Sequence, residues 1–358
     1  MAALKSLLRR LTPNQSSSDL STTGFSKTPN VTLFPKTNPS LDGDDCLHDC
    51  ASCTIKYPAK WSIDESEKLY GEVKGWSRHL IVATGKSDWV RDVTDEKGSI
   101  MEAVADSQIK PNSGRLMLSA SNIPVPENPE VEGSSRVLLL PSFTWVDNVL
   151  PSNVPELISH VINSAPTNTT PLDHKDPAAS LLSPPQTPLP SDLQFKIQDC
   201  PHTYLILLCS QKTRDARCGQ SAPLLRREFE RHLRPLGLYR DLQDERPGGV
   251  GIYFVSHVGG HKFAANVLIY RRVGAAGVKS PSKEENEAAQ RNGLHDENSG
   301  NKKHDEETRE AAQCIWLARV RPEDCENIVR YTVLQGKVVK PERQLRGGFD
   351  RSRQLVSW

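Results

Sequence analysis

The stretch GVGIYFVSHVGGHKFAANVLIY, residues 249–270, contains two apolar runs of strand length that are separated by a polar corner. The runs cover 249–256 and 263–270, and we expect each to form a buried strand. The corner contains His257 and His261, with three residues between them, two of which are glycine. Because a Gly-Gly pair disfavours a helix, we expect a hairpin corner with both imidazoles at one edge of a sheet.

The flanking residues extend this stretch into a domain over 191–340. Ser221 can cap a helix that Pro235 ends, and Gly336 is the expected stop of a second helix. The expected elements, in chain order, are a strand over 203–209, a helix over 221–234, strands over 249–256, 263–270 and 314–320, and a helix over 323–334. This β-α-β-β-β-α order predicts an α/β (α+β) domain whose strand ends and helix starts gather at one edge.

A smaller N-terminal α/β domain, 43–162, has a looser version of the same order. Its expected elements are a strand over 79–85, a helix over 98–108, strands over 116–121 and 136–141, and a helix over 154–162. We interpret this domain as a degenerate repeat of the C-terminal unit. It has no counterpart of the histidine corner, so we expect no such chemistry there.

Three segments lack apolar periodicity and are expected to be disordered. They are a lead over 1–42, a linker over 163–190 that is rich in Pro, Ser and Thr, and a charged insertion over 277–310 between two strands. Residues 341–358 are expected to form a C-terminal tail. The ordered part is therefore expected to be two small domains rather than two large ones.

The composition excludes several protein classes. The formal net charge of +1 provides no general attraction to nucleic acid or to a membrane surface. No run approaches the roughly 18 apolar residues of a transmembrane helix, so we expect no membrane span. Lys5, Arg9 and Arg10 lie among leucines before any acidic residue. This pattern fits a mitochondrial presequence and equally a disordered lead, and either indicates an intracellular protein.

The chain has eight cysteines, and in a reducing compartment these favour metal binding, redox chemistry or burial over disulfides. Cys209 ends the first strand of the C-terminal domain and Cys218 lies just before its first helix, so both are expected at the same edge as His257 and His261. Two thiols and two imidazoles are enough for a closed metal site, and a helix N-terminus stabilises a thiolate. The cysteines expected to be simply buried are Cys200, Cys314 and Cys325.

Zinc is the first metal to consider for such a set of ligands. The fit is incomplete, because zinc fingers have about two to four residues between the cysteines and carry the histidines on a helix. Here eight residues separate Cys209 from Cys218, and the Gly-Gly corner disfavours a helix. The spacing therefore does not identify the metal.

Four stretches resemble a known family: LCSQKTRDARCGQSAP, GLYRD, SHVGGHKFAANVLIY and IWLARVRPE. They are similar to the fungal sucrase/ferredoxin-like family of thioredoxin-like ferredoxins, which includes the actin patches distal proteins and a mitochondrial relative. The resemblance covers roughly 45–358 and is strongest over 199–275. It implies a thioredoxin-like fold in the C-terminal domain and a [2Fe-2S] cluster with four ligands, which are Cys209, Cys218, His257 and His261.

The resemblance implies an electron-transfer protein, with roles in oxidative-stress tolerance and actin patch organisation. Despite the family's name, no pair of carboxylates lies in a glycosidase context, so we expect an electron carrier rather than a hydrolase. Two thiolates and two neutral imidazoles bring an oxidised cluster to a charge of about zero, which raises its potential relative to a site with four thiolates. Each imidazole also keeps a second nitrogen, through which electron uptake can be coupled to protonation. The sequence does not indicate which ligands share an iron.

Two features suggest partners. Lys212, Arg214 and Arg217 form a basic loop beside the expected cluster, which is either a docking patch for an acidic redox partner or simply a solvated loop. The terminal Trp358 is similar to the aromatic tail by which the targeting complex of the assembly machinery recognises cytosolic iron-sulfur proteins, although an uncommitted tail fits as well. The tail favours a cytoplasmic location, with a mitochondrial one as the alternative.

Two alternative functions remain open. One is a zinc-stabilised interaction module without redox turnover. The other is a thiol oxidoreductase that uses Cys50 and Cys53, which lie in the segment CLHDCASC, 46–53. This segment lacks the strand and helix that flank a thioredoxin dithiol. A peripheral zinc or redox thiol site there would involve Cys46, His48, Cys50 and Cys53.

Overall fold

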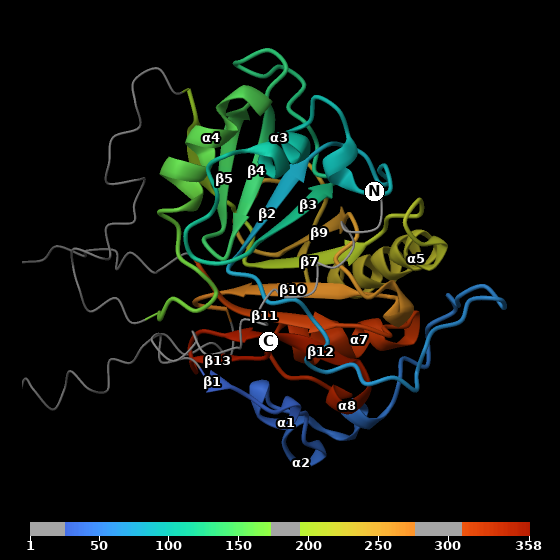
Figure 1. The fold of residues 1–358 in the computed structure, drawn as a ribbon. Helices are drawn as coiled ribbons and strands as arrows, with labels where there is room; N and C mark the ends of the chain where they lie inside the picture. Colours follow the sequence, from blue (N-terminus) through green and yellow to red (C-terminus); the bar gives the residue numbers. More distant parts are fainter. Residues whose placement is uncertain (1–25, 173–193, 276–309) are drawn as a thin grey trace, which may run out of the picture.

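The computed structural model describes residues 26–172, 194–275 and 310–358. In its C-terminal half, β7 (Tyr204–Cys209) pairs in parallel with β9 (Val250–Val255) on one side and antiparallel with β10 (Val267–Arg272) on the other (Figure 1). Strand β11 (Ala311–Leu317) continues the sheet beside β10. The hairpin expected between 249–256 and 263–270 is therefore wrong, because β7 lies between these two strands.

The helices of this half follow β7 and β11. Helix α5 (Ala216–Leu233) crosses from β7 to β9. After β11 the chain forms one helical run of three parts: a 3-10 turn (Pro322–Asp324), α7 (Cys325–Asn327) and a π-helical turn (Ile328–Val333). Gly336 ends this run in the left-handed region with a φ of 71°, as predicted. The strand order β11-β10-β7-β9 is that of a thioredoxin-like fold, and the expected fold class is confirmed.

The N-terminal half has the same order and directions of strands, β5-β4-β2-β3. Its elements are β2 (Arg78–Ala83), α3 (Ile100–Asp106), β3 (Leu116–Ser121), β4 (Ser135–Leu140), β5 (Thr144–Val149), a 3-10 turn (Pro151–Asn153), α4 (Val154–Glu156) and a π-helical turn (Leu157–Ile162). The sequence did not predict β5. The turn before it contains no glycine, and Phe143 adopts the left-handed conformation there with a φ of 55°.

The two halves share one sheet and also pack against each other. They are joined where β3 pairs antiparallel with β9 at Ser121 and Val255. One apolar cluster contains residues of both halves, among them Ile81, Leu138, Leu207 and Leu268. The helices cover the opposite faces, with α5 and the helical run after β11 on one half and α3 and α4 on the other (Figure 1). The half-sheets therefore lie face to face between two helical layers.

Both ends of the described chain extend the sheet, in contrast to the expected lead and tail. Strands β12 (Leu345–Asp350) and β13 (Leu355–Val356) follow β11, and β1 (Ser26–Lys27) pairs in parallel with β13. The prediction of disorder is wrong for residues 26–42, because Leu33 and Phe34 from this segment are buried in the core. The prediction of a tail over 341–358 is wrong as well, since these residues supply hydrogen-bonded edge strands.

The remaining elements are short. They are α1 (Asn30–Leu33), α2 (Pro39–Asp42), β6 (Lys196–Asp199), β8 (Tyr239–Arg240), α8 (Pro341–Gln344) and 3-10 turns at Asp44–Leu47, Val93–Asp95 and His261–Phe263. The first ten residues of the expected linker pack on the protein, since the Asn168 N–H donates to the Ser77 carbonyl at 2.9 Å and Leu172 is buried. Residues 173–190 of that linker, and the insertion over 277–309, lie outside the described residues. Among the described helices, none combines the length and the apolar character needed to cross a membrane.

A buried histidine links the two half-sheets. His79 on β2 is fully buried, and its Nδ1 lies 3.1 Å from the Tyr270 hydroxyl on β10, while its Nε2 lies 2.9 Å from the Ser119 hydroxyl. Burial lowers the pKa of this imidazole to about 3. The unfolded chain, in which the pKa is near the ordinary value of about 6.5, therefore takes up this proton first as the pH falls.

We expect this difference to make the fold less stable between pH 6.5 and pH 3. From pH 7.5 to pH 5.5, His79 should account for a loss of about 1.4 kcal/mol in the free energy of unfolding. His79→Gln keeps polar atoms at this position and should remove that part of the pH dependence in urea unfolding. Tyr270→Phe removes the same hydrogen bond without removing the imidazole, so it should keep the pH dependence. Equal pH dependence in wild type and His79→Gln would contradict this account.

Candidate metal centre

Four chain segments meet at one edge of the C-terminal half-sheet. Because β7 and β9 are parallel, their carboxyl ends, Cys209 and Val255, are register partners. Strand β10 is antiparallel to β7, so it begins at the same edge, where Val267 pairs with Leu208. His257 directly follows β9 and His261 precedes β10. The expectation that strand ends and the first helix start gather at one edge therefore agrees with the structure.

Cys218 lies inside the helix and not in front of it. Helix α5 begins at Ala216, five residues before the expected start at 221. The Asp215 side chain accepts the Arg217 N–H at 2.9 Å and caps the helix in place of Ser221. Cys218 therefore occupies the first turn, where the helix dipole favours a thiolate. Gly219 allows the helix to lie against the preceding loop, since a Cβ there would come within 2.5 Å of the Lys212 Cβ.

The four side chains lie at this edge with the sulfurs buried and the imidazoles toward solvent, although among the described residues no three of their ligand atoms come within 4.8 Å of one another. Cys209 and Cys218 are fully buried, whereas His257 and His261 are half-buried. The Cys218 thiol hydrogen-bonds to Cys209, which lowers the pKa of Cys209 and, together with burial, raises the pKa of Cys218. The His257 ring and the Val258 N–H also hydrogen-bond to the Cys209 sulfur. The ring centroids of the two histidines are 5.3 Å apart.

Both imidazoles leave a nitrogen unused. The Nδ1 atoms of His257 and His261 are buried and have no hydrogen-bond partner among the described residues. Unpartnered buried polar atoms are costly and indicate that something else satisfies them. Burial and the charge of His257 lower the pKa of His261, which favours the neutral, ligating form of this imidazole. Two thiols in contact and two free ring nitrogens fit a metal group with sulfur and nitrogen ligands.

Arg346 holds the histidine corner in place. Its buried guanidinium donates to the Gly259 carbonyl at 2.7 Å, to the Asn266 side chain at 3.0 Å and to the Glu72 carbonyl at 3.0 Å. Its plane also lies over the Trp316 ring, 4.4 Å from the centroid. Burial lowers the pKa of Arg346 to about 10, so it keeps its charge at neutral pH. The corner is thus fixed by a cation from β12, a strand that the sequence did not predict.

The N-terminal half supports the loop between the two cysteines. Two side chains of this loop donate hydrogen bonds to the loop after β2. The Ser210 hydroxyl donates to the Ser87 carbonyl at 2.9 Å, and the Gln211 amide donates to the Val90 carbonyl at 2.5 Å. The Asp88 carboxylate accepts the Thr213 N–H at 3.0 Å. The N-terminal half therefore supports the loop that connects the candidate ligands Cys209 and Cys218 in the C-terminal half.

Trp61 and Ile63 cover the cysteines from outside the sheet. Both pack against Cys209, Cys218 and Ala264, and the Trp61 indole donates to the Arg217 carbonyl at 3.3 Å. Sequence analysis missed these residues and Arg346. A tryptophan in an otherwise polar segment was the available signal for Trp61, but nothing near Arg346 marks it as a neighbour of the histidines.

The expected docking residues differ in their surroundings. Lys212 is exposed, and Arg214 is half-buried and donates to the Arg91 carbonyl at 3.3 Å. Arg217 forms an ion pair with Asp215 at 2.8 Å, so its charge is compensated. Trp358 does not lie on a free tail. Its ring stacks on the Trp76 ring with centroids 4.3 Å apart. The expectation that Trp358 lies on a flexible tail is therefore wrong.

The remaining cysteines separate into two groups. Cys200, Cys314 and Cys325 are buried, as expected. Within CLHDCASC, Cys46 and Cys50 are buried and Cys53 is partly exposed. Cys50 lies beside His232 at the end of α5, with its sulfur 3.9 Å from Nε2.

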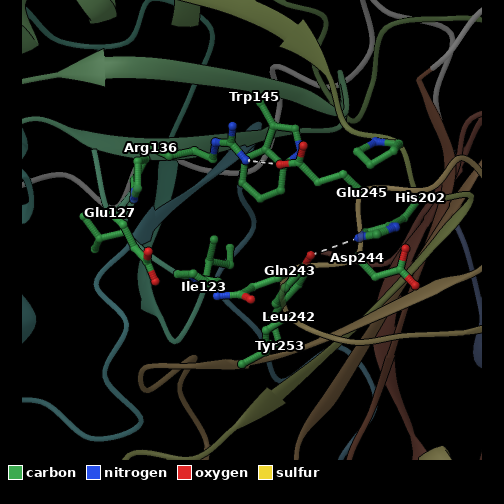
Figure 2. A pocket seen from close by; sticks show the side chains of 14 residues that line it. Ile123, Glu127, Arg136, Trp145, His202, Leu242, Gln243, Asp244, Glu245 and Tyr253 are labelled. Carbon is green, nitrogen blue, oxygen red and sulfur yellow. Dashed lines mark hydrogen bonds and ion pairs between the residues drawn. The ribbon is translucent and has the colours of Figure 1, made fainter. Parts of the chain in front are cut away.

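A cavity of about 250 Å³ lies near the junction of the two halves (Figure 2). Two contacts form part of its wall. Arg136 and Glu245 form an ion pair with a nitrogen-to-oxygen distance of 2.7 Å, and the Tyr253 hydroxyl lies 3.0 Å from the His202 Nε2. None of the four candidate ligands lines it. We therefore assign it no role in the metal centre.

The two corner glycines allow a matched test of this geometry. Both have positive φ, 92° at Gly259 and 65° at Gly260, so either alanine variant should cost about 1 kcal/mol of backbone strain. A Cβ at Gly260 would also come within 2.3 Å of the Arg346 guanidinium, whereas a Cβ at Gly259 meets nothing within 4 Å. Gly260→Ala should therefore lower the free energy of unfolding by about 2 kcal/mol more than Gly259→Ala, measured in urea. Equal losses would show that Arg346 does not hold the corner.

Comparisons with known proteins identify the family of the chain. No solved structure matches the chain. Actin patches distal protein 1 of Saccharomyces cerevisiae is 31% identical over 227 residues, which cover 60% of this chain and 67% of that protein. Altered inheritance of mitochondria protein 32 of Clavispora lusitaniae is 26% identical over 299 residues, covering 81% of this chain and 89% of that protein. The model of the Sucrase/ferredoxin-like family matches residues 69–347, and the chain belongs to this family.

Proposed function

We propose that the protein is an electron-transfer protein with a [2Fe-2S] cluster bound by Cys209, Cys218, His257 and His261. The observation that carries this proposal is the meeting of two contacting thiols and two unpartnered imidazole nitrogens at one edge of a sheet. When bound, the cluster would supply one-electron redox chemistry. We propose no hydrolase activity.

The surrounding residues favour a relatively high reduction potential. Two neutral imidazoles in place of thiolates leave less negative charge at the site. The Val258 N–H hydrogen-bonds to Cys209, and the charge of Arg346 acts on the same sulfur. Both interactions stabilise added negative charge. The free Nδ1 atoms are buried, but the half-buried histidine rings lie nearer to solvent than the sulfurs, where a partner can approach.

We place the docking patch at Lys212 and Arg214. Both lie on the loop between the two cysteines, so a partner bound there would be close to the cluster. Arg217 contributes little, since Asp215 compensates its charge. A positive patch of this kind suits an acidic redox partner, because complementary charges speed association.

The names of the relatives suggest the cellular role. The match to an actin patches distal protein supports actin patch organisation and a cytoplasmic location. We propose oxidative-stress tolerance as an associated role. The match to an altered inheritance of mitochondria protein keeps the mitochondrial alternative open. Recognition of Trp358 by the cytosolic iron-sulfur assembly machinery would require its ring to leave Trp76. Two alternatives remain: a zinc-stabilised interaction module, and a thiol oxidoreductase that uses Cys50 and Cys53.

Spectroscopy distinguishes these functions. The anaerobically purified protein should be red-brown and, after reduction, give the EPR signal of a [2Fe-2S] centre. His257→Ala, His261→Ala and Cys218→Ser should each lose most of the visible absorption, because each removes one ligand. Cys325→Ala, which removes a buried thiol outside the group, should keep it. A colourless protein with stoichiometric zinc would favour the interaction module, and redox activity that survives both histidine replacements would favour the thiol oxidoreductase.

Charge reversal tests the docking patch. Lys212→Glu and Arg214→Glu together should slow electron transfer to an acidic acceptor about tenfold or more at low salt, and the difference should shrink as salt screens the charges. Lys262→Glu reverses an exposed charge outside this loop and serves as the control. Unchanged low-salt rates in the double variant would exclude docking at this loop.

A further inference from the structure

A second group of ligand-type side chains lies at the other end of α5. The Cys50 sulfur, the His232 ring and the Glu326 carboxylate each offer one atom, and these three atoms lie within 4.8 Å of one another. They come from three separate parts of the chain: the segment 46–53, the last turn of α5 and α7. The segment is fastened by its backbone to the 3-10 turn just before α7, since the Cys50 N–H donates to the Glu323 carbonyl at 3.0 Å.

Two further side chains border this group. A Glu228 carboxylate oxygen lies 3.6 Å from the His232 Nε2, and Glu228 is only 2% exposed. The Cys53 thiol hydrogen-bonds to the Glu228 carboxylate as well. The spacing Cys-x-x-Cys thus brings both sulfurs to the same face of α5. Soft sulfur, imidazole nitrogen and carboxylate oxygen together are the donor set that zinc prefers.

A positive group already occupies the centre of these acceptors. The Arg231 guanidinium lies 3.4 Å from the Cys50 sulfur, 3.0 Å from the His232 Nε2 and 2.7 Å from the Glu228 carboxylate. The Arg231 side chain is 40% exposed, so its guanidinium can turn toward solvent without disturbing buried residues. The sulfur, imidazole and carboxylate groups therefore attract a cation, and the guanidinium of Arg231 that they bind can be displaced by a metal ion.

We propose that Cys50, His232 and Glu326 bind a zinc ion, with Glu228 as the fourth ligand and with Arg231 displaced toward solvent. The charges suit a divalent ion, since one thiolate, two carboxylates and a neutral imidazole leave a net charge of about minus one, which Arg231 offsets from the solvent side. The ion would be structural, because it would tie the segment 46–53 to α5 and α7 and leave no position for substrate. This site does not depend on the proposed cluster, which uses none of these residues.

Cobalt(II) reports on such a site through its sulfur charge-transfer and tetrahedral bands. The full chain carrying Cys209→Ser and Cys218→Ser lacks the sulfurs of the first site, so any charge-transfer band must come from another thiolate. We expect one cobalt per chain, displaced by zinc. Cys50→Ser should abolish the charge-transfer band, and His232→Asn and Glu326→Gln should each weaken binding about tenfold or more. Cys46→Ala, a neighbouring buried thiol, is the control and should change neither.

Arg231→Gln distinguishes a metal site from a group of side chains that serves only to bind the Arg231 guanidinium. If the guanidinium only competes with the ion, this variant should bind cobalt more tightly than its parent. Absence of a charge-transfer band in the parent, or its persistence after Cys50→Ser, would overturn the proposal, as would weaker binding in Arg231→Gln. If Cys50→Ser does not fold, as judged by circular dichroism, His232→Asn and Glu326→Gln decide the outcome.

Discussion

The candidate metal centre depends on one constraint, which is that β7 is hydrogen-bonded on both sides. Its parallel partner β9 ends at the edge where β7 ends, and its antiparallel partner β10 begins there. Cys209, His257 and His261 therefore reach the same edge from three strands, and the capped start of α5 adds Cys218. Had β9 and β10 formed a hairpin with each other, the histidines would sit at a turn and the thiol of β7 would not be fixed between the strand ends.

The second constraint is the packing of the two half-sheets against each other. Both halves have the same order of strands, but the four candidate ligands all lie in the C-terminal half. In the N-terminal half, the loop after β2 has become a support that accepts hydrogen bonds from Ser210 and Gln211. This support holds the loop between the candidate ligands Cys209 and Cys218 in place.

Charge at the centre is adjusted by residues that lie far away in the sequence. Arg346 comes from an edge strand, and it fixes the Gly-Gly corner while placing a buried positive charge near Cys209. Asp215 both caps α5 and neutralises Arg217, so the basic loop is less positive than its sequence indicates. The same residue thus positions one ligand and limits the docking patch.

Local sequence established β7, β9, β10 and β11 of the C-terminal half, the stop at Gly336 and the edge where the four candidate ligands lie, because apolar runs and glycine stops depend on nearby residues. It misplaced the start of α5, since Ser221 and Asp215 are both good caps and the packing of Gly219 against Lys212 selects between them. It also assigned 26–42 to disorder and 341–358 to a tail, because the edge strands there are stabilised by partners that are distant in the chain. Tertiary packing alone placed β7 between β9 and β10, the loop after β2 against the loop that follows Cys209, and Arg346 against the histidine corner. The physical reason is that these contacts join residues far apart in the chain, and no local sequence pattern encodes which strands pair.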